Sequence, residues 1–150
     1  MKNIVFILII LFGAIPTLKA DVKKWQLEQV GFLNIDRNEK DYGGFSGLLI
    51  KNAGTEALVV TDKSFFFVLE LRRDDNDFLT GYSVIKKGRI LSSKGEHLNG
   101  RNTDSESIAM DANNNYYISF ESNHRIMMHT EVEGKGIFVP KHPMFRKLSV

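Results

Sequence analysis

The sequence predicts an all-β protein made of antiparallel four-stranded blades of a β-propeller. Two observations carry this prediction. After residue 20, apolar residues come in short runs rich in Val, Ile, Phe and Tyr, separated by Gly, Asn and Asp, which is typical of strands and turns. The same order of strands then occurs twice, about 60 positions apart, and a four-stranded antiparallel unit repeated in tandem is a propeller blade.

The first 20 residues have the layout of a signal peptide. Lys2 precedes an apolar run, Ile4–Ile15, which Pro16 ends, and the small residue Ala20 marks the expected cleavage site. An uncleaved membrane anchor is the alternative, but a spanning helix needs roughly 20 apolar residues and this run is shorter. We therefore expect residues 1–20 to be a signal peptide and the protein to be exported to the periplasm or the extracellular space.

The remaining elements are predicted strands joined by polar turns, with no helix expected. Residues 25–35 alternate loosely between apolar and polar side chains. Clearer strands are predicted at 46–50, 57–61, 65–71, 106–110, 116–120 and 125–132, and a weaker one at 82–91, which contains Gly88. Turns are expected at 52–54, 74–77 and 111–115, where Asn, Asp or Gly can adopt the required backbone angles. Asp111, Asn113 and Asn115 imitate the start of an EF-hand loop but lack its Gly and its final Glu, so they predict a polar turn.

The internal repeat pairs two sequence segments that share one order of elements. Gly47-Leu48-Leu49-Ile50 corresponds to Ser107-Ile108-Ala109-Met110, a step of 60, and Asp62 corresponds to Glu121, a step of 59. Each copy has a short apolar strand, a turn, a second strand ending in an acid, and a third strand. The period exceeds the ~40–50 residues of common blade families. A chance likeness between two β-meanders is the alternative explanation.

Four motifs in this order resemble the phytase-like family (esterase-like activity of phytase). They are Phe45-Ser46-Gly47-Leu48, then Ala57 to Ser64, then Asp104-Ser105-Glu106-Ser107-Ile108-Ala109, and Tyr117 to Glu121 followed by His124-Arg125-Ile126. The resemblance runs from about Tyr42 to the C-terminus, and Ser107 stands where the family has Gly. It implies that residues 21–150 are the N-terminal portion of a longer propeller domain. Because a propeller closes with ~4–8 blades, we expect two to three blades here and a truncated propeller.

Charge and composition exclude several classes of function. The chain has 20 Lys and Arg against 18 Asp and Glu, and removing Lys2 and Lys19 with the leader makes residues 21–150 neutral. A neutral domain gives no electrostatic reason to bind nucleic acid or an anionic membrane. The chain has no cysteine, so disulfides and thiolate metal sites are excluded.

The candidate site is a set of acids at predicted strand ends. Asp62, Asp104, Glu106 and Glu121 are the candidate metal ligands, and strand ends on one face of a propeller converge around its channel. Ca²⁺ is the expected cofactor because it takes 6–8 oxygen ligands. Glu106, Glu121, His124 and Arg125 are the candidate catalytic residues, with Lys63 nearby. The alternative is that these acids cap turns and pair locally, Glu121 with Arg125 and Asp62 with Lys63.

The resemblance implies three functional hypotheses. The first is an exported, calcium-dependent phosphoesterase that acts on a small phosphorylated substrate. The second is a non-catalytic propeller that binds a ligand or partner through the same face, and the third is an inactive truncated product. Open sheet edges also predict that chains could oligomerise.

Overall fold

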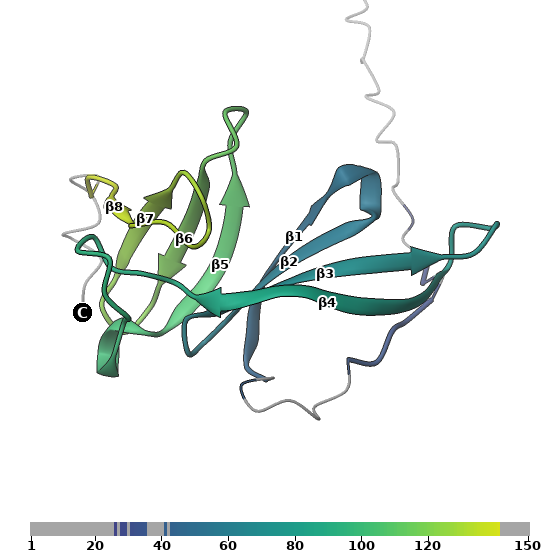
Figure 1. Cartoon of the computed structure of the whole chain (residues 1–150), viewed down its shortest axis with the longest axis horizontal. Coiled ribbons are helices and arrows are strands. Elements are labelled where there is room, and N and C mark those ends of the chain that lie inside the picture. The colour runs from purple at the N-terminus through teal and green to yellow at the C-terminus, as the bar shows by residue number, and fades with distance from the viewer. Residues whose placement is uncertain (1–25, 27, 30, 36–40, 42, 142–150) are drawn as a thin grey trace, which may run out of the picture.

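The computed structural model describes residues 26, 28–29, 31–35, 41 and 43–141 and contains two four-stranded antiparallel sheets (Figure 1). The predicted signal peptide lies outside the described residues. Within the described part of the chain, no helix has the length and apolar character needed to cross a membrane. The strands are β1 (Phe45–Lys51), β2 (Glu56–Thr61), β3 (Phe65–Arg73), β4 (Leu79–Arg89), β5 (Ser105–Met110), β6 (Tyr116–Phe120), β7 (Arg125–His129) and β8 (Ile137–Phe138).

Each sheet is a meander in which every strand pairs with its neighbour in the sequence. The orders are β1-β2-β3-β4 and β5-β6-β7-β8. Figure 1 shows the two sheets side by side, with the long strand β4 leading into the connection to the second sheet. The predicted all-β class and the four-stranded antiparallel blades are therefore confirmed. The described residues form two blades, and these do not close into a ring.

Aspartate side chains shape two of the hairpin turns. Asp74 Oδ1 accepts the N–H groups of Asn76 and Phe78 between β3 and β4. Asp111 Oδ1 accepts those of Asn113 and Asn115 between β5 and β6. Such bonds fold the backbone back on itself without a metal ion. The predicted polar turn at 111–115 is confirmed.

Two features of the strand pattern differ from the prediction. Strand β8 was not expected, and its two residues pair with Met127 and Met128 of β7. The described positions of the stretch 25–35 carry no strand, although the stretch alternates in sequence. Alternation gives a strand only where a neighbouring strand supplies hydrogen-bond partners. Two short 3-10 turns, Asn52–Gly54 and Gly100–Asn102, complete the elements.

A β-bulge at the same place in both sheets confirms the internal repeat. In the first sheet the pairing skips Ser46, between Phe45↔Thr61 and Gly47↔Val60. In the second it skips Glu106, between Ser105↔Phe120 and Ser107↔Ser119. The offsets are 60 from Ser46 to Glu106 and 59 from Thr61 to Phe120, as the sequence repeat predicts. Chance likeness of two meanders does not account for a shared bulge, which is a specific local feature.

The main hydrophobic core lies between the two sheets. From the first sheet it takes Leu58, Val60 and Phe66, which are almost fully buried. From the second it takes Ile108, Ile118, Phe120 and Met127, and Ile90, Leu98 and Val132 close it. A second cluster, Ala57, Val59, Phe67 and Leu69, lies on the opposite face of the first sheet, with Ile35 packed against it. The middle strands of the first sheet, β2 and β3, are thus buried on both faces, as in a blade inside a propeller.

Strands β1 and β5 approach closely where the two sheets meet. Ser46 Oγ donates to Ser105 O at 2.5 Å, and Ser105 Oγ donates to Thr61 O at 2.5 Å. A Cβ at Gly47 would lie 2.9 Å from Ile108 N, closer than real contacts allow. The Ser-Gly pair of the first motif therefore has a structural role, since it joins one blade to the next.

Candidate functional site

Three carboxylates converge at the end of the second sheet that lies beside β1. Asp104 directly precedes β5, Glu106 is the bulged residue of β5, and Glu121 directly follows β6. One carboxylate oxygen from each lies within 4.8 Å of the others. The structure therefore brings together three of the four residues predicted as metal ligands.

Backbone hydrogen bonds fix the two strand ends that carry these acids. Glu121 N–H donates to Asp104 O at 2.9 Å, which holds the end of β6 against the start of β5. In the first sheet Asp62 N–H donates to Gly44 O at 2.8 Å in the same way. Asp62 and Glu121 are thus equivalent in structure, as the repeat predicts.

Asp62 belongs to the neighbouring sheet and lies at the margin of the cluster. Its carboxylate rests against Gly44, where a Cβ would come 2.1 Å from Asp62 Oδ1. Gly44 also has a φ of 63°, so a side chain there would be strained as well as obstructed. The negative charge of Asp62 is the smallest of the effects that raise the pKa of Glu106.

The acids of the cluster have unequal environments. Ser122 donates from both its Oγ and its backbone N–H to Asp104 Oδ2, and these bonds lower the pKa of Asp104. The pKa of Glu106 is raised, first by lost hydration and then by the charges on Asp104, Glu121 and Asp62. Crowded carboxylates that keep their charge favour a bound cation. Ser122 was not predicted, since a hydroxyl in a turn carries no distinctive sequence signal.

The basic residues predicted near the site do not pair with the acids. Among the described residues, the ion pairs are Lys51–Glu56, Arg73–Asp77 and Lys86–Glu133. Arg125 instead lies over the Phe120 ring, 3.8 Å from its centre, and donates to Asn102 O and Asn123 O. The expected local pairs of Glu121 with Arg125 and of Asp62 with Lys63 are therefore absent from the described residues.

Three basic side chains lie at the rim of the cluster. Lys63 and His124 are exposed and follow Asp62 and Glu121 in their turns. Arg101, which was not predicted, is also exposed and reaches Ser122 O at 3.5 Å. Acids at the centre with cations around them can hold a metal ion and an anionic ligand together.

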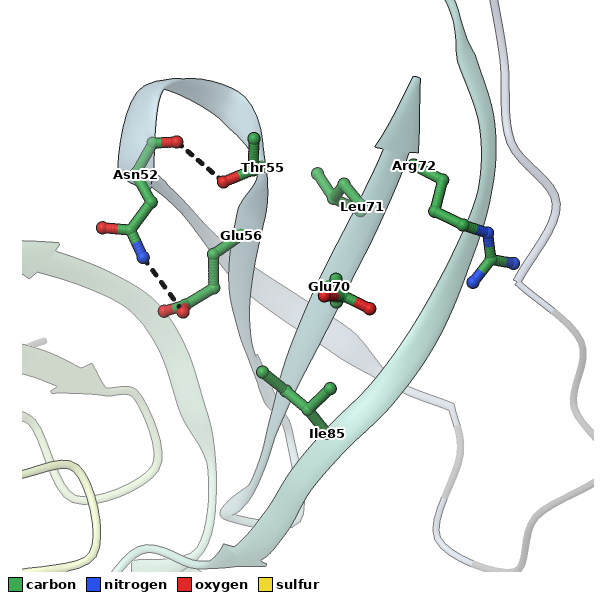
Figure 2. A pocket seen from close by; sticks show the side chains of 7 residues that line it. All are labelled: Asn52, Thr55, Glu56, Glu70, Leu71, Arg72 and Ile85. Atoms are coloured by element: carbon green, nitrogen blue, oxygen red, sulfur yellow. Dashed lines mark hydrogen bonds between the residues drawn. The ribbon is translucent and has the colours of Figure 1, made fainter. Parts of the chain in front are cut away.

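A separate hollow lies on the first sheet, away from the acids (Figure 2). It is lined by Asn52, Thr55, Glu56, Glu70, Leu71, Arg72 and Ile85. Two of its charged groups are already engaged: Glu56 accepts from Asn52 and pairs with Lys51 at 3.3 Å, and Arg72 donates to Ser83. The hollow offers no convergent set of unsatisfied groups, so the carboxylate cluster is the stronger candidate.

The comparison with protein families decides the family. The sequence profile described as phytase-like, esterase-like activity of phytase, matches residues 40–143. The chain belongs to the phytase-like family. The match includes all four candidate ligands and both blades of the phytase-like domain. No curated protein and no solved structure matched the chain.

Proposed function

We propose that this phytase-like protein is exported and that its carboxylate cluster binds Ca²⁺ and a small phosphorylated substrate for hydrolysis. The observation that carries the proposal is the convergence of Asp104, Glu106 and Glu121 without a cationic partner among the described residues. Export rests on the leader-like sequence of residues 1–20.

The donor set fits calcium. Carboxylate oxygens are hard ligands, and Ca²⁺ accepts 6–8 of them in a flexible arrangement. Asp104, Glu106 and Glu121 would hold the ion, with Asp62 beside them at the margin. Bound there, Ca²⁺ would neutralise phosphate charge and polarise the phosphorus–oxygen bonds.

The protein's own side chains would orient the substrate. Ser122 keeps the Asp104 carboxylate ionised and fixed, so that residue is the preorganised ligand. Lys63, His124 and Arg101 at the rim would contact the phosphate oxygens.

The test is hydrolysis of a chromogenic phosphate monoester by the purified protein in Ca²⁺ and in EDTA. We expect activity only with Ca²⁺, and a loss of at least about tenfold in Glu106→Gln and in Glu121→Gln, because each removes a ligand charge. Glu131→Gln is the matched control, since Glu131 is an exposed acid in the turn after β7.

Each result has a defined meaning. Hydrolysis that is unchanged by EDTA and by both variants would contradict the proposal. Calcium binding without any turnover would instead support the non-catalytic propeller and remove the enzymatic half of the proposal.

A further inference from the structure

Three serine hydroxyls bridge the two sheets beside the carboxylate cluster. Ser46 Oγ donates to Ser105 O at 2.5 Å, and Ser105 Oγ donates to Thr61 O at 2.5 Å. Ser64, in the turn between β2 and β3, donates from its Oγ to Thr103 O. Ser64 is 2% exposed and Ser105 is fully buried. Hydrogen bonds in such a dry environment are stronger than the same bonds in water.

Two of these bonds hold the segment that carries Asp104 from both sides. Thr103 and Asp104 lie between the second 3-10 turn and β5, outside any strand. Ser64 holds the carbonyl before Asp104, and Ser46 holds the carbonyl after it. The carbonyl of Asp104 itself accepts the N–H of Glu121 at 2.9 Å. Three successive carbonyls are thus fixed, two of them by the first sheet.

The third bond links the acid of the first sheet to the cluster. Thr61, whose carbonyl accepts Ser105 Oγ, directly precedes Asp62. Ser105 lies between Asp104 and Glu106 in the sequence. The joint between the two blades is therefore one residue away from three of the four candidate ligands.

The cluster needs such support because its carboxylates repel one another. One oxygen of each acid lies within 4.8 Å of the others, and like charges at this distance push apart. Glu106 lies within β5 and Glu121 directly follows β6, so paired strands hold both. Asp104 precedes its strand and depends on the bonds to its neighbouring carbonyls. A set of ligands that is already in place binds an ion more tightly than one that must be ordered on binding.

We propose that Ser46 and Ser64 are positioning residues for the calcium site, through which the first blade determines where Asp104 of the second blade lies. The inference rests on the calcium site proposed above. Both hydroxyls donate to backbone carbonyls, so they act on the ion through the position of its ligand. Removing a group that orients a metal ligand typically weakens metal binding by roughly 10–100-fold. The flexible coordination of Ca²⁺ places the expected effect at the lower end of that range.

The backbone at Ser64 allows its hydroxyl to be removed with little loss of stability. Ser64 has a φ of 58°, a conformation that glycine adopts more readily than serine. Thr103 O keeps a second donor, the N–H of Ser105 at 2.7 Å. Ser64→Gly therefore relieves the backbone and leaves that carbonyl bonded, which offsets the loss of one hydrogen bond. Weaker calcium binding in this variant would report on the position of the ligand.

Calorimetric titration with Ca²⁺ of the purified protein, produced from its full reading frame, tests the inference. Ser64→Gly and Ser46→Ala should each raise the dissociation constant for Ca²⁺ about tenfold. In EDTA, the melting temperature of Ser64→Gly should stay within about 5 °C of the wild type. Asn114→Gly is the control for the backbone change, since Asn114 has a φ of 63° at the far end of β5. Ser83→Ala is the control for a lost hydroxyl, because Ser83 accepts from Arg72 away from the joint.

The outcomes separate this inference from the proposed function. A wild-type protein without saturable Ca²⁺ binding would remove the proposed calcium site, and this inference with it. Wild-type binding that both serine variants leave unchanged would overturn this inference alone, as would controls that weaken binding equally. Weaker binding in the serine variants, with both controls like the wild type, would make the first blade part of the site. Ser46→Ala gives the answer even where Ser64→Gly fails to fold.

Discussion

Replacing Gly47 by Ala should destabilise the protein by loosening the joint between its two blades. The new Cβ would lie 2.9 Å from Ile108 N, 3.0 Å from Ser107 C and 2.7 Å from Val60 Cγ2, where ordinary contacts begin at 3.4 Å. Two of these atoms belong to the backbone, so strand β5 must retreat by roughly half an ångström.

The retreat would weaken the hydrogen bonds that cross the joint and open the core beneath it. Overpacking of this kind costs about 1–3 kcal/mol in the free energy of unfolding. For a unit of this size we expect the melting temperature to fall by roughly 10 °C. A thermal melt followed by circular dichroism measures it, with Gly31→Ala as the control because no atom lies near that position. A Gly47→Ala protein that melts with the wild type would refute the close approach of β1 and β5.

Three further predictions concern buried or turn-forming polar groups. Ser105→Ala should lower the free energy of unfolding by about 1–3 kcal/mol in a denaturant titration, because the buried Thr61 carbonyl loses its donor; a change below 0.5 kcal/mol would count against that bond. Burial lowers the pKa of His129, so as the pH falls the unfolded chain binds a proton at a higher pH than the folded protein does. The free energy of unfolding should therefore decrease as the pH drops below about 6.5. A free energy of unfolding that stays level from about pH 7.5 to 5.5 in the same titration would contradict this. Asp111→Ala should lower the free energy of unfolding by about 1–2 kcal/mol, since the carboxylate caps the turn through the N–H groups of Asn113 and Asn115. An unchanged midpoint in the denaturant titration would exclude a role for this cap.

The sequence predicted most strands because their apolar residues come in short runs rich in Val, Ile, Phe and Tyr, with Gly, Asn and Asp between the runs. It did not predict β8, whose two exposed residues are too few to show a period. The stretch 25–35 alternates in sequence, but its described positions form no strand, because a strand also needs a neighbouring strand as hydrogen-bond partner.

The candidate site was predictable as far as the repeat determines it. Because Asp62 and Glu121 are equivalent in the repeat, the sequence placed an acid at the end of a strand in each copy. Asp104 and Glu106, with Ser105 between them, placed two more acids at the start of a third strand. The repeat could not show that Arg125 turns to the Phe120 ring, because that choice depends on the packing of one side chain. Nor could it show the part played by Ser122, which depends on a turn conformation.

The measurement that tests the central claim most directly is a calorimetric titration of the metal-free protein with Ca²⁺. The account predicts saturable binding of one ion at the cluster of Asp104, Glu106 and Glu121, weakened at least about tenfold by Glu106→Gln and unaffected by Glu131→Gln. Absence of saturable binding, or binding that Glu106→Gln leaves unchanged, would contradict the assignment of this cluster as the calcium site.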